Sequence, residues 1–242
     1  MMLAAAVCPC PPLLVPEVAA GAAPELDAAR TACADALGVL AASRPDLLVV
    51  VGPAEQSGRG VHPRGTLGSF AGFGVDVDVR LGAPGATGAP DAGAERVLPP
   101  SLAVAAWLLE RIGWADAPVE GLGVGEPLAP ERCIQVGREI AARAERVALL
   151  VMGDASACRT LKAPGYLDER AAPFDAEVAR ALGAADVTAL KELDPELAYA
   201  LKASGRAPWQ VLAGAAEGAG LSGALLYEDA PYGVGYLVAT WS

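Results

Sequence analysis

The chain has 242 residues, a hydrophobic fraction of 53% and a formal net charge of −11, from 18 basic and 29 acidic side chains. A chain of this length and apolar content can bury the core of an α/β domain. Its negative charge repels phosphate backbones and anionic lipid headgroups, which argues against nucleic acid and membrane surfaces as partners.

The first third of the chain predicts two buried strands that flank a helix. Residues 3–7 form an apolar run that ends at a proline-rich turn, which is typical of a buried strand. Pro24 suits the first turn of a helix, and apolar residues at helical spacing predict that helix over 24–42. Residues 47–51 are apolar without alternation, which indicates a strand covered on both faces in a parallel sheet. A loop is predicted over 52–72.

The middle of the chain is less regular. Valine and aspartate alternate over 75–79, which predicts a strand with one face toward solvent. Residues 82–96 are rich in Gly, Ala and Pro and predict a surface loop. Helices are predicted over 101–112 and 131–143, with a weak strand over 119–124 between them.

The last third combines one strongly apolar strand, over 147–152, with several short helices. The remaining predicted elements are helices over 174–182, 186–193, 196–203 and 209–216, and strands over 224–227 and 235–241. Strands and helices alternate through most of the chain. We therefore predict a single α/β domain over 1–242, with a mostly parallel central sheet and helices on both faces.

The N-terminal sequence and the cysteine content predict a cytoplasmic protein. The N-terminus has no basic segment, and prolines interrupt it early, so it does not resemble a signal peptide. No apolar run approaches the roughly 18 residues of a membrane span. The five cysteines are odd in number and scattered, which is typical of free thiols in a reducing compartment.

Candidate site residues follow the predicted strands. In open α/β sheets, sites form beyond the carboxyl ends of the parallel strands. Polar or reactive side chains follow three such strands and also lie in the glycine-rich segment near the C-terminus. The candidate pocket residues are Cys10, Glu55, Asp154, Ser156 and Glu228.

Several short motifs follow one another in a recognisable order. They are Gly153-Asp154-Ala155-Ser156, Ala163-Pro164-Gly165-Tyr166, Phe174-Asp175, Tyr227-Glu228 and Gly233-Val234-Gly235-Tyr236. This series resembles the catalytic B-subunit family of the class III extradiol ring-cleavage dioxygenases, and more closely its Memo-like branch, over nearly the whole chain. The resemblance implies that family's fold. It also implies a non-haem Fe(II) held by two histidines and a carboxylate, with a further histidine as acid and base.

The chain departs from that family at the histidines. Cys10 stands where the resemblance places the first histidine, Ala54 where it places the second, and Ala157 where it places the acid/base histidine. An alanine methyl group has no lone pair, so it neither ligates iron nor carries a proton. His62 is the only histidine in the sequence. We therefore predict a diverged member without cofactor or ring cleavage, which binds a small molecule or a protein partner.

Alternatives remain open from the sequence. A rebuilt site could hold Zn or Fe(II) with Cys10, His62 and Glu228, the last of which matches a glutamate of the family. Otherwise His62 is expected to be a solvated loop residue. Cys8 and Cys10 are either a redox thiol pair or buried fillers.

Two further questions stay open. Asp154 is either a turn cap or a site carboxylate. A homodimer is the default assembly, since two-fold dimers are the commonest oligomers.

Overall fold

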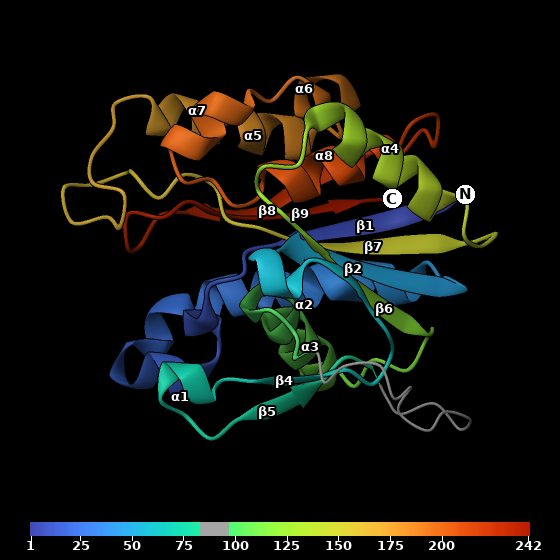
Figure 1. Ribbon diagram of the computed structural model, residues 1–242, viewed down its shortest axis with the longest axis horizontal. Helices are drawn as coiled ribbons and strands as arrows, with labels where there is room; N and C mark the ends of the chain where they lie inside the picture. The colour runs from blue at the N-terminus through green and yellow to red at the C-terminus, as the bar shows by residue number, and fades with distance from the viewer. Residues whose placement is uncertain (83–96) are drawn as a thin grey trace.

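The computed structural model describes residues 1–82 and 97–242, so the predicted loop over 82–96 lies almost wholly outside the described residues. In the described part, a seven-stranded sheet with strand order β3-β6-β2-β7-β1-β9-β8 lies between two layers of helices (Figure 1). The strands are β1 (Met2–Cys8), β2 (Leu47–Pro53), β3 (Gly60–His62), β6 (Val119–Val124), β7 (Val147–Met152), β8 (Gly223–Asp229) and β9 (Tyr236–Trp241).

The centre of the sheet is parallel. Strands β6, β2, β7 and β1 run in one direction, so Val51 lies opposite Leu122 on one side and Val151 on the other. Strand β3 is antiparallel to β6, and β9 is antiparallel to both β1 and β8. The carboxyl ends of the four central strands therefore meet at one edge of the sheet. The predicted α/β fold, with its mostly parallel sheet, is confirmed.

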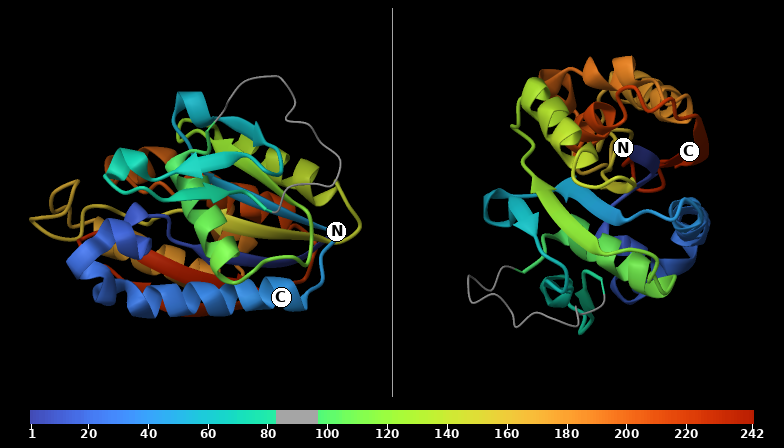
Figure 2. Two further views of the ribbon diagram at one scale, coloured as in Figure 1. Left: turned by 90° about the horizontal axis from the view of Figure 1, so that it is seen from below. Right: turned by 90° about the vertical axis from the view of Figure 1, so that its right-hand side faces the viewer.

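Helices cover both faces of the sheet (Figures 1 and 2). Val49 and Val51 pack into one apolar core, and Leu48 and Val50 pack into the other. This explains why the central strands are apolar without alternation. One layer contains α4 (Pro130–Ala141), α5 (Ala171–Gly183), α6 (Val187–Lys191), α7 (Pro195–Ala200) and α8 (Arg206–Ala215), and the other contains α2 (Asp27–Ala42) and α3 (Pro100–Arg111).

Three predicted segments differ from the structure. Helix α2 begins at Asp27, because the residues before it form the 3-10 helix η2 (Ala20–Leu26), with Pro24 inside. The predicted loop over 52–72 contains β3 and the short strand β4 (Leu67–Ser69). The predicted strand over 75–79 is β5 (Asp78–Arg80), which pairs with β4 in a separate two-stranded sheet. Backbone pairing, which alternation alone does not reveal, decides the boundaries of the three strands.

The remaining short elements follow β1 and β2 in the chain or join β4 to β5. They are η1 (Pro12–Leu14), α1 (Pro16–Ala19), η3 (Gln56–Gly58) and η4 (Ala71–Phe73). Within residues 1–82 and 97–242, no helix combines the length and apolar character that crossing a membrane requires.

Candidate functional site

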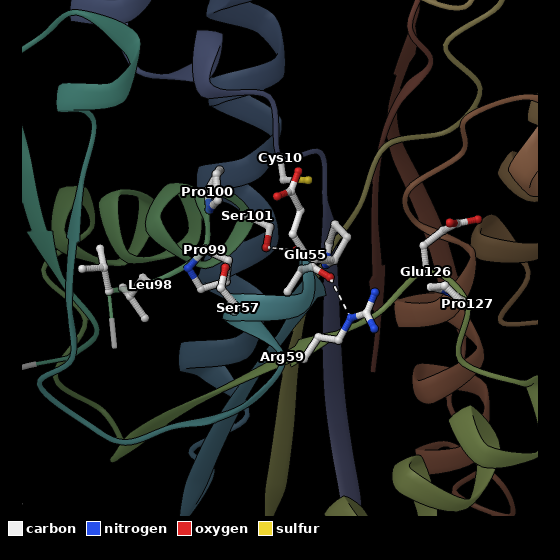
Figure 3. Close-up of a pocket in the computed structure, with 14 residues that line it drawn as sticks. Cys10, Glu55, Ser57, Arg59, Leu98, Pro99, Pro100, Ser101, Glu126 and Pro127 are labelled. Atoms are coloured by element: carbon white, nitrogen blue, oxygen red, sulfur yellow. Dashed lines mark hydrogen bonds between the residues drawn. The ribbon is translucent and has the colours of Figure 1, made fainter. Parts of the chain in front are cut away.

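A cavity of about 910 Å³ opens at the carboxyl ends of β1, β2 and β6 (Figure 3). Cys10 follows β1, Ala54 and Glu55 follow β2, and Glu126 follows β6. The first turn of α3 forms the facing wall with Ser101. The volume lies within the range of small-molecule sites, and the position is the one that open α/β sheets use for ligands.

The cavity walls are largely apolar and stiff. Four prolines contribute, and Leu98 lies beside them. The hydroxyl of Ser101 donates a hydrogen bond to the Pro53 carbonyl oxygen (2.7 Å), which ties α3 to the end of β2. Proline has a fixed φ and little conformational freedom to lose, so such walls are preorganised for an apolar ligand. The prolines are Pro53, Pro99, Pro100 and Pro127.

His62 supports the turn that lines one side of the cavity. Its side chain is fully buried, and Nε2 donates to the Gly58 carbonyl oxygen (2.8 Å). The Gly58 amide in turn donates to the Glu55 carbonyl oxygen (2.9 Å). The expectation of a solvated loop histidine is therefore wrong: β3 pairs with β6, and this pairing carries His62 into the interior.

A buried arginine holds the opposite wall. Arg206, at the start of α8, is 2% exposed and donates to the backbone oxygens of Glu126 and Leu128. Its side chain also donates to Gln210 Oε1 (3.0 Å). Sequence reasoning missed this residue, because a single arginine in a helix gives no sign of which distant loop it contacts.

Cys10 is tied to Asp154 across the edge of the sheet. The Cys10 amide donates to Asp154 Oδ1 (2.8 Å), and the Cys10 Sγ lies 3.9 Å from Asp154 Oδ2. The Asp154 amide donates to the Ser204 hydroxyl (3.1 Å). Asp154 is not among the residues that line the cavity; it lies directly behind one that does. It caps none of the described helices, and it holds the proline-rich turn after β1.

Burial dominates the electrostatics of this pair. Desolvation raises the pKa of Asp154 to about 6, against the opposing effect of the hydrogen bonds from Cys10. Burial, and then the nearby Asp154 charge, raise the pKa of the Cys10 thiol. Burial also raises the pKa of Tyr236, to which the Asp154 charge adds.

The other candidates after β7 do not face the cavity. Ser156 is fully buried, and both its amide and its hydroxyl donate to Asp175 (2.8 and 2.9 Å). Arg159 completes the network with an ion pair to Asp175 (3.0 Å). Ala157 is buried, and its amide donates to the Leu201 carbonyl oxygen (2.8 Å). The prediction of Ser156 as a pocket residue is therefore wrong, because its side chain is buried away from the cavity and hydrogen-bonded to Asp175.

Glu228 is also misplaced for a site with Cys10. It is exposed on β8, at one edge of the sheet, whereas His62 lies in β3 at the other edge. Six strand spacings separate these two strands, which is roughly 28 Å. The rebuilt metal site from Cys10, His62 and Glu228 is therefore wrong. Among the residues that the structure describes, no three His, Cys, Asp or Glu side chains are placed to hold a metal ion.

The thiols do not have the character of a redox pair. All five cysteines are free and buried. Contact with Cys33 and burial raise the pKa of Cys8, just as burial raises that of Cys10. A reactive thiol requires a lowered pKa, so the geometry favours Cys8 and Cys10 as buried fillers.

No model of a known protein family matches the sequence, and no curated protein matches it. Solved structures do match the fold. One is the crystal structure of an uncharacterized protein from Escherichia coli K12, with a TM-score of 0.52 and 16% sequence identity, covering 99% of this chain and 100% of that one. Similarity at this level of identity supports the α/β fold and no more.

Proposed function

We propose that this chain is a small-molecule-binding protein on a scaffold like that of the class III extradiol dioxygenases, and that it does not cleave aromatic rings through iron. The observation that carries the proposal is the composition of the cavity. It lies where the fold class places its ligands, yet Cys10 and Ala54 occupy the two positions that the resemblance assigns to histidines.

The residues present do not fit the ferrous iron of that family. Such iron takes two imidazoles and a carboxylate. The one imidazole of the sequence is that of His62, which is buried behind the cavity turn and donates to the Gly58 carbonyl oxygen. Cys10 is a protonated thiol that points toward a carboxylate, so it is a poor replacement for a histidine ligand.

The walls support binding of a flat or compact apolar body. Four prolines, Ala54, Val97 and Leu98 form the apolar part of the wall, and Glu55, Arg59 and Glu126 add charged groups to it. Small-molecule sites have this composition, with an apolar interior and a small number of polar groups that set orientation. Five buried free thiols also favour a reducing compartment, and we propose a cytoplasmic location on that ground.

A combined binding and product assay tests the proposal. Purified protein is incubated aerobically with Fe(II) and catechol; catechol is followed by ligand-observed NMR, and bound iron by elemental analysis. We expect catechol to bind and to remain intact, with iron well below one equivalent. A ring-opened product together with stoichiometric iron would contradict the proposal.

A blocked variant shows whether binding occurs in this cavity. Ala54→Phe places a ring inside the cavity and should abolish the binding of catechol. Ala142→Phe adds the same ring at the exposed end of α4 and should leave binding unchanged. Equal binding by both variants would place the ligand elsewhere and reject the assigned site.

A further inference from the structure

The charges around the cavity are unequal. Glu55 and Glu126 line it, and Asp154 lies behind its Cys10 wall. Of the lining residues that the structure describes, Arg59 alone is cationic. With Asp154 ionised, the described residues therefore place three carboxylates in or directly behind the cavity wall, against one guanidinium.

The negative charge of Asp154 is poorly compensated by its surroundings. Its Oδ1 receives the Cys10 amide, but the donor nearest to Oδ2 is a thiol sulfur 3.9 Å away, which is a weak interaction. In the part of the chain that the structure describes, Asp154 makes no ion pair, and no basic group lowers its pKa. Asp154 is partly exposed, so its carboxylate is partly removed from water without a cation beside it. Such a carboxylate is destabilised in its charged form, and a positive charge placed nearby relieves that cost.

The position of Arg59 leaves this imbalance in place. Its Nε lies 3.5 Å from the Ala54 carbonyl oxygen, and its side chain packs over Gly125 at the end of β6. Figure 3 draws Arg59 on the Glu126 side of the cavity and Cys10 on the other side, near Glu55. Glu55 and Asp154 thus lie at the Cys10 end of the cavity.

We propose that the cavity takes a small organic cation: an apolar, ring-sized body that carries a protonated amine, with the amine at the Cys10 end. The proline walls accommodate the body, and Glu55 and Asp154 attract the charge. The acidic character of the whole chain adds to this attraction at long range. This inference rests on the proposed small-molecule function and specifies the charge of the ligand.

Three probes of matched size test the charge alone. Benzylamine, benzyl alcohol and benzoate share one ring and are cationic, neutral and anionic at pH 7.5. Their dissociation constants are measured by NMR titration of the full chain at low salt. We expect benzylamine to bind at least tenfold tighter than benzoate and several-fold tighter than benzyl alcohol, with the advantage falling at high salt.

Variants identify the carboxylates that are responsible. Asp154→Asn keeps an acceptor for the Cys10 amide, and Glu55→Gln changes a cavity wall, so each should weaken benzylamine several-fold and leave benzyl alcohol unchanged. Glu145→Gln is the matched control, because Glu145 is exposed just before β7, at the opposite end of the strand from Asp154. If Asp154→Asn does not fold, Glu55→Gln still decides the question.

The outcomes separate this inference from the function on which it rests. Equal affinity for the three probes, or a preference for benzoate, would overturn the cationic ligand and leave the binding function standing. If neither catechol nor any of the three probes binds, the proposed function itself fails.

Discussion

Three loops at the same edge of the sheet differ in how tightly they pack against their neighbours. The loops after β2 and β6 leave a cavity of about 910 Å³ between them, whereas residues 155–158 of the loop after β7 are buried in the interior. Gly205 at the start of α8 lies so close to Gly153 that a side chain at Gly153 would clash with its backbone, and Ser156 is buried against Asp175. A site in this fold therefore forms at the carboxyl ends of parallel strands, and the neighbouring elements determine whether a cavity remains there.

The largest effect is expected in the packed region. Asp175→Ala removes the acceptor for the Ser156 amide and hydroxyl and the partner of Arg159. Breaking a buried, hydrogen-bonded charge network costs on the order of 3–5 kcal/mol, so the free energy of unfolding in denaturant should fall by that amount.

The control for this variant is Asp168→Ala, which removes a surface ion pair with Arg170 and should change stability little. A loss for Asp175→Ala as small as that expected for Asp168→Ala would mean that the loop after β7 is not held by Asp175, and the contrast between the two regions would disappear.

Next in size is the pH dependence that Asp154 carries. Its pKa is about 6 in the folded chain, against 3.8 for an aspartate in water, so folding binds a proton between these pH values. Its contribution to stability is therefore greatest below pH 4, falls as the pH rises to 6, and stays constant above. The difference is up to roughly 3 kcal/mol.

Asp154→Asn should remove this slope and make the chain more stable than the wild type at pH 7. Chemical denaturation at pH 4, 5, 6 and 7 measures the effect. Asp168 offers a comparison of opposite sign, since its hydrogen bonds from Arg170 lower its pKa to about 2. An unchanged slope in Asp154→Asn would show that Asp154 is solvated and has no unusual proton affinity.

The smallest effect on stability, with a large effect on binding, is expected at Gly123. A Cβ on this residue would overlap the Gly58 carbonyl oxygen, the same oxygen that accepts from His62. Gly123→Ala should displace the turn after β2, abolish ligand binding and cost about 1–3 kcal/mol.

Gly38→Ala is the matched control, because nothing lies within 4 Å of a Cβ at this position in α2. It should bind normally and be slightly more stable, since alanine favours helix over glycine. Normal ligand binding by Gly123→Ala would separate the turn from the site.

The central strands could be predicted from the sequence because burial of both faces of a strand requires an unbroken run of apolar residues. Residues 47–51 and 147–152 are apolar on both faces, whereas a strand with one face in water would alternate. Of the candidate pocket residues, Cys10 and Glu55 line the cavity, as does the degenerate position Ala54. Ser156 and Glu228 were placed at the site by the same reasoning, and wrongly, because the pattern does not record which loops are covered by other elements.

The sequence by itself determined the fold class and the side chains that are present. It predicts a parallel α/β sheet, and it contains one histidine and no imidazole at positions 10, 54 or 157. The tertiary structure alone decided the arrangement. It put His62 behind the cavity turn, Asp154 against the Cys10 amide and Arg206 under the Glu126 wall. The reason is physical: local propensity and periodicity act over a few residues, whereas these contacts join segments that lie far apart in the chain and meet only when the sheet assembles.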